Sequence, residues 1–490
     1  MRYRLNQTLA TAGIAMLVSG CAVGPDFKSP PAPAASGYTE RPLPAQTVAA
    51  RGEAQKFSSD EKIPAQWWTL FRSEKLDQLV KAALAGSPSV EAAKATLNQA
   101  RETLTSQTGY EFPQVDLALG TQRQRFSPSA FGGTNPPTVF SLYNASVKVS
   151  YGIDLFGGLR RMIEAQGAQV DYERYQLEGA RLALTANVVT AAISEASLRE
   201  QIRATQEIVD ASERQLAIAE KQYALGGIPK SALLLQRNQV AQARAALPPL
   251  EQNLERVRSQ LAVYVGKTPS EAKLPEISLD DLHLPDTLPV SLPSKLARQR
   301  PDILAAEALL HAASAQVGVA TANLYPQITL TASAGTQSIS SSTLFANNTD
   351  IWNFAAGVTQ PIFHAGSLRA QKRAAVDAYD KALADYRSTL LQSFQNVSDS
   401  LTALQADART LKARSESEAS SKEALSLAQR QFELGASSYL TLLAAQTQYQ
   451  QDRIASIAAR ASRYADSAAL LQSLGGGWWN QPKNGEVSDD

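Results

Sequence analysis

The sequence predicts an α+β membrane protein in which two tandem structural repeats each combine a β-hairpin with long helices. Three observations support this fold class. Two proline-free stretches, residues 159–225 and 368–434, are rich in residues that favour helix. Short motifs of the first half recur in the second half in the same order. Each half also contains two segments in which apolar residues alternate with polar or small ones.

Each proline-free stretch is long enough for a single helix of about 65 residues. Gly167 and Gly179 are their only interior glycines. At ~1.5 Å per residue such a helix is roughly 100 Å long, which far exceeds an ordinary globular helix. We therefore expect the protein to span a long distance.

The two halves of the chain share four blocks of similar sequence at nearly constant spacing. AEKQYALGG, which starts at Ala219, matches AQRQFELGA, which starts at Ala428. The other blocks are SPSVEAAKA at 87 with RPDILAAEA at 300, EFPQVDL at 111 with LYPQITL at 324, and GGLR at 157 with GSLR at 366. Chance similarity between alanine-rich helices would not keep this order. We therefore interpret the chain as two copies of one long unit.

Residues 1–20 have the pattern of a signal peptide, in which two arginines precede a mostly apolar core and small residues follow. Val18-Ser19-Gly20-Cys21 resembles a bacterial lipobox, so we expect a lipid on Cys21, the only cysteine of the chain. A buried structural cysteine is the alternative. Residue 22 is Ala rather than the Asp that commonly holds bacterial lipoproteins at the inner membrane. This favours delivery to the outer membrane.

Residues 21–72 are expected to form a lipidated N-terminal strap, because residues 22–40 are rich in proline and small residues. Repeat 1 should occupy residues 73–265 and begin with a helix near Ser73. Gly86-Ser87-Pro88 should break that helix, and a second helix should run to about Thr108. Packing is the favoured role of the paired Trp67 and Trp68.

Two β-hairpins are predicted, at residues 113–154 and 326–363. In the first, Val115, Leu117 and Leu119 alternate with polar or small residues, and the pattern returns after a loop at 127–137. In the second, the segments 327–337 and 353–362 have the same character. Long strands with one apolar face and one small polar face are typical of a membrane β-barrel. A soluble hairpin packed on the helices is the alternative.

Four strands cannot close a barrel in lipid, because the open edges would leave backbone groups without hydrogen-bond partners. Closure therefore requires several chains, and three copies give twelve strands. A Gly-containing turn should follow each long helix, and shorter helices should return at about 230–265 and 438–474. Pro248 and Pro249 should kink or break the first of them.

The remaining segments are read from their composition. The proline-rich residues 266–295 are expected to form an equatorial belt segment outside the helices. Repeat 2 should then occupy 296–474, and residues 475–490 should form a C-terminal tail.

The sequence lacks the motifs of an enzyme, a metal site or a nucleic-acid-binding protein. The net charge is +1, so bulk electrostatics give no reason to expect nucleic acid. The three histidines, His283, His311 and His364, lack metal-ligand spacing, and no nucleophile or phosphate-loop motif has a suitable context. We therefore expect no catalytic residue, no metal and no cofactor. After residue 21 we find no run apolar enough for a transmembrane helix.

Several motifs carry a family resemblance. Cys21-Ala22-Val23-Gly24-Pro25-Asp26-Phe27, followed by two prolines, resembles the start of outer-membrane efflux lipoproteins. The other motifs are Trp67-Trp68…Phe71, Arg300-Pro301-Asp302-Ile303, Tyr325-Pro326-Gln327 and Leu474-Gly475-Gly476-Gly477-Trp478. On these motifs the chain is similar to the TolC-like outer-membrane factors of NodT type, which serve resistance-nodulation-division (RND) pumps. The likeness covers essentially the whole mature chain.

The resemblance implies a homotrimer in which each chain gives four strands to a twelve-stranded β-barrel in the outer membrane. A long twelve-helix α-barrel would continue this β-barrel through the periplasm. A periplasmic adaptor (membrane fusion) protein and an inner-membrane RND pump would be the partners, together with outer membrane lipid. The adaptor would dock at the helix turns, through Leu225, Gly226, Leu434 and Gly435.

In this family the tunnel is shut at its periplasmic tip, near the same turns. Many relatives have acidic residues there, whereas the aligned places in this sequence hold Ala232, Thr441 and Ala444. We hypothesise an apolar gate instead, formed by Leu440 and Leu443 with Lys230 and Tyr439 nearby. Packing of these leucines between helices is the alternative.

We predict that the chain is the outer membrane channel of a tripartite RND-type efflux system. It would conduct small molecules, such as drugs or toxic compounds, passively from the periplasmic pump to the exterior. The alternatives are a type I protein-secretion duct and a periplasmic coiled-coil adaptor lipoprotein. The four amphipathic strands argue against the adaptor, which does not need them.

Overall fold

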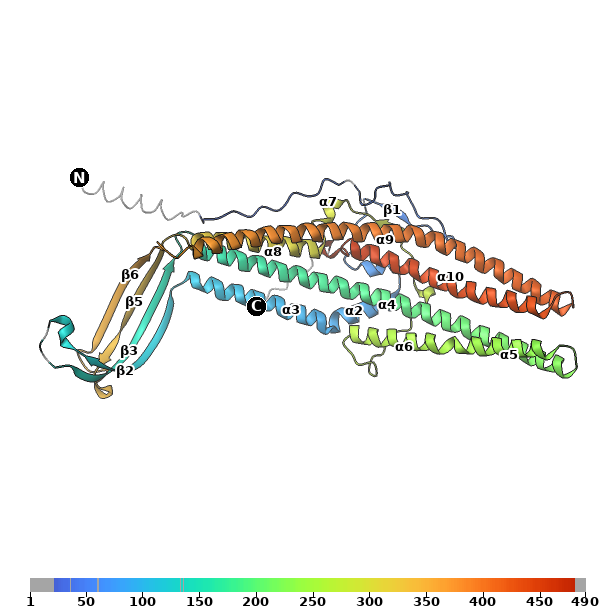
Figure 1. Cartoon of the computed structure of the whole chain (residues 1–490), viewed down its shortest axis with the longest axis horizontal. Coiled ribbons are helices and arrows are strands. Elements are labelled where there is room, and N and C mark those ends of the chain that lie inside the picture. The colour runs from blue at the N-terminus through green and yellow to red at the C-terminus, as the bar shows by residue number, and fades with distance from the viewer. Residues whose placement is uncertain (1–21, 36, 60, 133, 135, 481–490) are drawn as a thin grey trace. The chain divides into compact units, whose positions relative to one another are not determined.

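A computed structural model describes residues 22–480, except residues 36, 60, 133 and 135 (Figure 1). The chain divides into two compact units. One consists of Thr96–Arg174 and Ala305–Arg387 with the N-terminal stretch up to Pro30, and it contains the larger sheet. The other consists of Pro31–Ala95, Tyr175–Leu304 and the chain from Ser388 onward, and it contains the paired helices and the proline-rich segment.

The larger sheet is antiparallel, with the strand order β2–β3–β5–β6. Its strands are β2 (Gln114–Phe126), β3 (Thr138–Ile153), β5 (Gln327–Ser338) and β6 (Asp350–Thr359). They lie where the alternating patterns predict them. The two hairpins also share one register, because Gln114 pairs with Ser150 and its repeat equivalent Gln327 pairs with Thr359.

The pairing gives this sheet one apolar face and one polar or small face. Residues directly opposite one another in an antiparallel pair lie on the same face. Following the partners, Val115, Val149, Ala332 and Phe354 therefore share a face. The opposite face carries Gln114, Asp116, Ala118, Lys148, Ser150, Gln327, Thr329, Thr331, Asn353 and Gly357.

The long helices form as predicted. They are α4 (Gly158–Ala224) and α9 (Ser367–Glu433), of 67 residues each. The returning helices are α5 (Lys230–Ala245) and α6 (Leu247–Tyr264) in the first repeat, and α10 (Tyr439–Ser473) in the second. The first return helix breaks at Ala246, just before Pro248 and Pro249, because proline cannot continue the hydrogen-bond ladder. Figure 1 shows each long helix turning back beside its return helix.

The shorter helices also agree with the sequence. Helix α2 (Glu74–Gly86) begins after Ser73, whose hydroxyl accepts a hydrogen bond from the backbone N–H of Leu76. Helices α3 (Pro88–Thr108) and α8 (Pro301–Ala322) precede the two hairpins. The short 3-10 helices are η1 (Trp67–Phe71), η2 (Gly109–Glu111), η3 (Pro128–Phe131), η4 (Leu279–Asp281), η5 (Ser341–Thr343) and η6 (Trp478–Asn480).

The proline-rich segment 266–295 contains both short regular elements and buried side chains. It contributes β4 (Thr287–Pro289), which pairs in parallel with β1 (Lys56–Ser58), and it leads into α7 (Pro293–Leu296). Ile277, Leu279 and Leu288 are almost fully buried. Apolar residues spaced through the segment therefore hold it against the second unit.

Helix α8 corrects one expectation from the sequence. It is long and apolar enough to cross a membrane by length and composition alone, although no such run was expected after residue 21. In the structure, 44% of its most apolar window is buried. A buried core helix passes the same test, so this single helix is weak evidence for a span.

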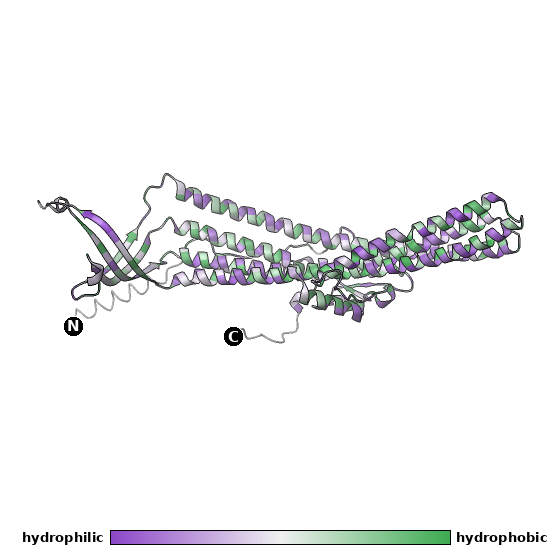
Figure 2. Cartoon of the chain, turned by 90° about the horizontal axis from the view of Figure 1, so that it is seen from below, coloured by the Kyte–Doolittle hydropathy of each residue, from purple (hydrophilic) through white to green (hydrophobic). Residues whose placement is uncertain are grey.

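Small residues line the packed faces of the paired helices at equivalent positions of the two repeats. Ser212 in α4 and Ser421 in α9 are buried, and so are Ala219 and Ala428. Small side chains let helices approach closely, which explains the alanine-rich composition of these stretches. In Figure 2, hydrophobic and hydrophilic positions interchange along these helix pairs.

An ion-pair cluster joins α6 to α4. The Glu195 side chain is fully buried, and its Oε1 accepts hydrogen bonds from Arg199 at 3.0 Å and from Arg258 at 2.7 Å. Removing one partner of a buried carboxylate leaves its charge poorly compensated.

We therefore predict that Arg258→Ala destabilises the second unit by about 1–3 kcal/mol. The matched control is Arg256→Ala, because Arg256 lies on the same helix and is exposed. Thermal loss of the helical circular-dichroism signal measures both variants. Equal midpoints for the two would contradict the structural role of the cluster.

Candidate functional site

The two turns at the ends of the long helices have the same backbone hydrogen bonds. Gly227 N–H donates to the carbonyl of Gln222 at 2.8 Å, and Gly226 N–H donates to Tyr223 at 3.0 Å. In the second repeat, Ala436 and Gly435 donate in the same way to Gln431 and Phe432, at 2.8 and 3.0 Å. These bonds define a Schellman motif, which needs a residue with positive φ. Gly226 and Gly435 supply it, with φ of 73° and 71°.

These turns present two leucines to the surroundings. Leu225 is 87% exposed and Leu434 is 83% exposed. Large apolar side chains held out at a helix end by a rigid turn are typical of a contact surface for a partner. The sequence-predicted docking residues therefore lie at equivalent, accessible places in the two repeats.

The predicted gate residues lie in the first turn of α10 and at the start of α5. Leu440 is 60% exposed, so it does not pack inside the chain, whereas Leu443 is half-buried. The buried leucine at this level is the neighbouring Leu442. Lys230 is exposed, and no hydrogen bond or ion pair joins it to Tyr439 in the described part of the chain.

Tyr439 is held by its own hairpin. Its ring meets Phe432 of α9 edge-on, with ring centroids 5.6 Å apart. Burial raises the pKa of Tyr439 to about 12, and its hydroxyl has no hydrogen-bond partner among the described residues. The side chain therefore stays neutral and acts through packing rather than charge.

Polar side chains lie among the buried residues of the helix pairs near the turns. Gln236 is fully buried, and its Nε2 donates to the carbonyl of Ser212 at 2.9 Å. Several buried oxygens there have no partner among the described residues, namely Ser212 Oγ, Gln215 Oε1, Gln236 Oε1 and Gln446 Oε1. Unpaired buried polar groups cost free energy, so this end of the bundle is held less firmly than an apolar core.

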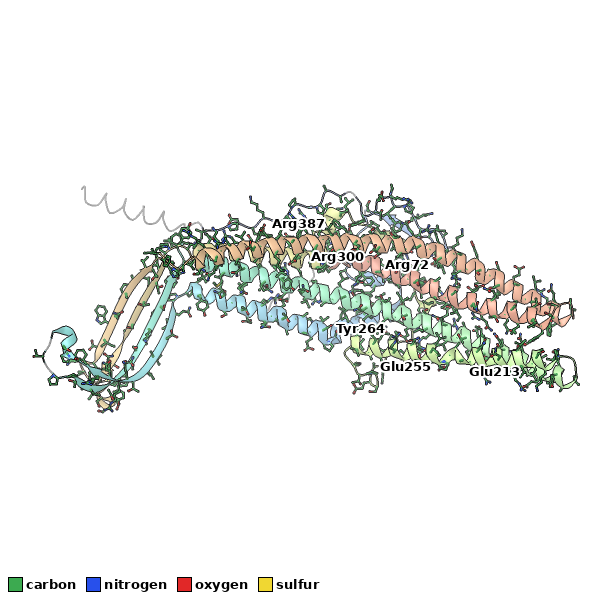
Figure 3. The ribbon with its side chains drawn as sticks, in the orientation of Figure 1. Arg72, Glu213, Glu255, Tyr264, Arg300 and Arg387 are labelled. Carbon is green, nitrogen blue, oxygen red and sulfur yellow. The ribbon has the colours of Figure 1, made fainter. Side chains whose placement is uncertain are left out.

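Ion pairs on the outside of the helices partly offset this weakness. Nε and Nη2 of Arg244 on α5 both donate to Oε1 of Glu213 on α4, at 2.9 and 2.7 Å. Figure 3 labels Glu213. Arg453 of α10 reaches Glu207 of α4 at 2.7 Å. The two helix pairs are thereby tied to each other.

Residues 45–57 form a small β-turn structure that contacts both α9 and α10. We call this segment the clip. Arg51 at its tip donates to Glu418 of α9 at 3.2 Å and to Ser456 of α10 at 3.1 Å. Arg51 has φ of 53°, a left-handed backbone that is unfavourable for a residue other than glycine. In return, the fully buried Arg463 of α10 donates to the carbonyl of Glu53 at 3.2 Å.

Two carboxyl groups meet beside the clip. Asp407 of α9 lies against Asp466 of α10, with Arg463 close by. Burial, together with the neighbouring Asp466 carboxyl, raises the pKa of Asp407 to about 7, against a smaller opposing effect of Arg463. At neutral pH the Asp407 carboxyl is therefore protonated far more often than an ordinary aspartate.

The N-terminal stretch of the first unit is seated on α4 and α8. Arg161, which is buried, donates to Asp26 at 2.6 Å and to Glu164 at 2.7 Å. Phe27 stacks on His311 at 4.4 Å, and His311 is hydrogen-bonded to Glu164 at 2.9 Å. His311 is therefore held in place by packing and by a hydrogen bond. Cys21, the predicted lipidation site, lies outside the described residues.

The sequence analysis missed the clip and the Arg161 cluster. Only the CAVGPDF motif hinted at the second, because it contains Asp26 and Phe27. Trp67 and Trp68 are buried, in agreement with the packing role. Among the described residues there is no group of three or more His, Cys, Asp or Glu side chains that could hold a metal.

A protein-family comparison assigns this architecture. The family model described as "Outer membrane efflux protein" matches residues 79–267 and 292–476, which together make up most of the chain. The chain belongs to the outer membrane efflux protein family. The two matched ranges cover both repeats, and the family confirms the TolC-like resemblance seen in the sequence.

Individual relatives agree with the family. The pyoverdine export outer membrane protein OpmQ of Pseudomonas aeruginosa is 30% identical over 94% of this chain and 96% of its own length. The toluene efflux pump outer membrane protein TtgC of Pseudomonas putida is 29% identical over 96% of each chain. The solved outer-membrane channel OprN has a TM-score of 0.84 at 25% identity and covers 94% of this chain and 100% of its own.

The outer membrane efflux protein described here is therefore a channel component of an efflux system, and its location is the outer membrane. Its fold is that of the TolC-like channels.

The turn geometry gives a first prediction for the site. Gly435→Ala places a Cβ on a residue with φ of 71°, which should cost about 1 kcal/mol. Faster amide hydrogen exchange around residues 430–440 measures the loosened turn. Ser437→Ala, two residues away, is the control and should leave exchange unchanged. Unchanged exchange in Gly435→Ala would show that the turn does not depend on the glycine.

The carboxyl pair gives a second prediction. Because the folded-state pKa of Asp407, about 7, lies above its usual value of 3.8, the folded protein binds an extra proton between these values. Stability should therefore fall as pH rises from about 4 to about 7. Asp407→Asn should reduce this fall and raise the melting temperature at pH 8 more than at pH 5. An unchanged pH dependence would contradict the raised pKa of Asp407.

Proposed function

We propose that the protein is a homotrimeric channel in which three four-stranded sheets close one twelve-stranded β-barrel in the outer membrane. The observation that carries this proposal is the sheet itself. Its apolar face is exposed, with Leu117 at 72% and Trp352 at 79%, and both edge strands have a free side in the described part of the chain. Lipid would cover that face, and neighbouring copies would cover the edges.

The long helices would line a twelve-helix α-barrel that crosses the periplasm. Each measures roughly 100 Å at ~1.5 Å per residue, which suits a span of that kind. Their turns, with Leu225 and Gly226 in one repeat and Leu434 and Gly435 in the other, would receive the tips of a periplasmic adaptor. An inner-membrane pump of the RND type would supply the energy, because the chain carries no nucleotide-binding motif.

The conduction path would be passive, and its gate would lie at the periplasmic end. Leu440 and Leu443 would form an apolar constriction that excludes water, with Tyr439 and Lys230 beside it. The exposure of Leu440 supports this role over packing within the chain, while the half-buried Leu443 supports it less strongly. Small molecules such as drugs or toxic compounds would pass through.

Lipidation of Cys21 would add a second attachment to the outer membrane. The Arg161 cluster supports this, because it holds the residues that follow Cys21 against the base of the sheet-bearing unit. A single lipid group is a weak tether, so the barrel would provide most of the anchoring.

Single-channel recording of the purified protein in a planar bilayer tests the proposal. We expect discrete openings from the trimer. Leu440→Ala and Leu443→Ala should increase the closed-state conductance by removing the constriction, whereas Leu309→Ala, an exposed leucine of α8, should not. Unchanged conductance in Leu443→Ala would exclude Leu443 from the gate. A monomer without openings would exclude the channel.

A protein-secretion duct remains the second candidate function, since both kinds of duct share the barrel and tunnel. The relatives support small-molecule export, because OpmQ is a pyoverdine export protein and TtgC is the outer membrane protein of a toluene efflux pump. A coiled-coil adaptor is disfavoured by the four paired strands.

A further inference from the structure

Strands β2 and β6 are the two edges of the larger sheet. In the trimer proposed above, on which this inference rests, β6 of one copy must pair with β2 of the next. We infer the register of that pairing: Phe354 lies opposite Thr121 of the next copy, so that Asp350 lies opposite its Arg125.

The first step follows the sheet within one chain. Val115 lies opposite Val149, Val149 lies opposite Ala332, and Ala332 lies opposite Phe354. These partners trace a line perpendicular to the strands. The next strand beyond Phe354 is β2 of the neighbouring copy. The register between copies is therefore defined by the β2 residue that lies opposite Phe354.

The second step uses the two faces of the sheet. A slip of one residue would turn the apolar side chains of the neighbouring copy to the polar face. Only residues on the apolar face of β2 can therefore lie opposite Phe354. These are Val115, Leu117, Leu119, Thr121, Arg123 and Arg125.

The third step uses the tilt of barrel strands. Strands in a closed barrel tilt by about 35–45° from the axis. Four strands at a spacing of ~4.8 Å cover ~19 Å across the sheet. With this tilt, the line of partners shifts along the strand direction by ~13–19 Å for each chain, which corresponds to ~4–6 residues. The shift starts from Val115 and must be towards higher residue numbers, because β2 begins at Gln114. Leu119 and Thr121 remain as candidates.

The fourth step uses the strand ends. The line of partners that starts at Gln114, the first residue of β2, passes through Ser150 and Thr331 and reaches Ala355. Thr331 is already four residues beyond the start of β5 at Gln327, and Ala355 is four residues before the end of β6 at Thr359. The line of partners has therefore shifted by four residues along the strands by the time it reaches β6. The pairing of β6 with β2 of the next copy increases this shift beyond four residues, which favours Thr121 over Leu119.

The chemistry of the two edges fits this register. It places Asp350 directly opposite Arg125, and opposite charges facing each other across strands stabilise the pair. Both side chains are exposed, and neither forms an ion pair within the described part of the chain. Trp352 then lies opposite Arg123, where a cation can rest on the indole ring. Val358 lies opposite Leu117, so apolar side chains meet near the start of β2 and the end of β6.

Engineered disulfides test the register. Val358→Cys with Leu117→Cys should give a covalent trimer on a non-reducing gel of the membrane-extracted protein. The matched controls shift the partner by two residues either way, as Val358→Cys with Leu119→Cys and Val358→Cys with Val115→Cys. Both should cross-link far less. Each single variant controls for bonds to Cys21.

Reversing the charges of Arg125 and Asp350 tests the register independently of the disulfides, through the thermal stability of the trimer. Arg125→Asp alone and Asp350→Arg alone should lower the temperature at which the trimer dissociates in detergent. The double variant Arg125→Asp with Asp350→Arg should restore it, whereas Arg123→Asp with Asp350→Arg should not.

The outcomes separate this inference from the proposed function. Preferential cross-linking of either control pair, or rescue by Arg123→Asp rather than Arg125→Asp, would overturn the register. A trimeric mass without cross-linking in any pair would overturn the register and leave the trimer intact. A monomeric mass would overturn the proposed trimer and this inference with it.

Discussion

A backbone N–H or C=O inside a lipid bilayer needs a hydrogen-bond partner, because no water is there to supply one. This requirement governs the architecture of the protein. Each chain offers a four-stranded sheet whose inner pairings are complete and whose edges, β2 and β6, stay open. A chain with only four such strands cannot satisfy its own edges in a bilayer, and this is the reason for the trimer proposed above.

The rest of the chain follows from what such a channel must do across the periplasm. The 67-residue helices supply length, and their alanine-rich faces allow close side-by-side packing at equivalent positions of both repeats. Towards the turns, the interior includes glutamine and serine side chains with unpaired oxygens beside the buried Leu233 and Leu442. The clip, by contrast, fastens α9 to α10 through Arg51 and Arg463. The clip thus braces α9 and α10 away from their turn, whereas Gln446 of α10, nearer the turn, has an unpaired buried oxygen.

The sequence predicted the periodic elements well for physical reasons. The strand hairpins, the long helices and the break before Pro248 depend on local patterns that a chain carries in every context. The repeat also predicted the matching turns, since Gly226 and Gly435 occupy equivalent positions. The burial of Ile277 and Leu279 in the proline-rich segment was missed, because composition shows an extended path but not the surface beneath it. The apolar character of α8, as opposed to its presence, was not expected either.

The candidate site was only partly readable for a similar reason. Leu225 and Leu434 stand next to turn glycines, so their exposure could be expected from sequence. The clip depends on contacts between residues hundreds of positions apart, such as Arg51 with Ser456, and no local pattern signals them. The raised pKa of Asp407 likewise depends on burial and on Asp466 of another helix.

The most direct test of this account is the mass of the protein extracted from the outer membrane in a mild detergent, measured by native mass spectrometry. The account predicts a particle of three chains, because three four-stranded sheets close the barrel. A stable monomer would contradict it, since the edges of β2 and β6 would then have to be satisfied without a second copy.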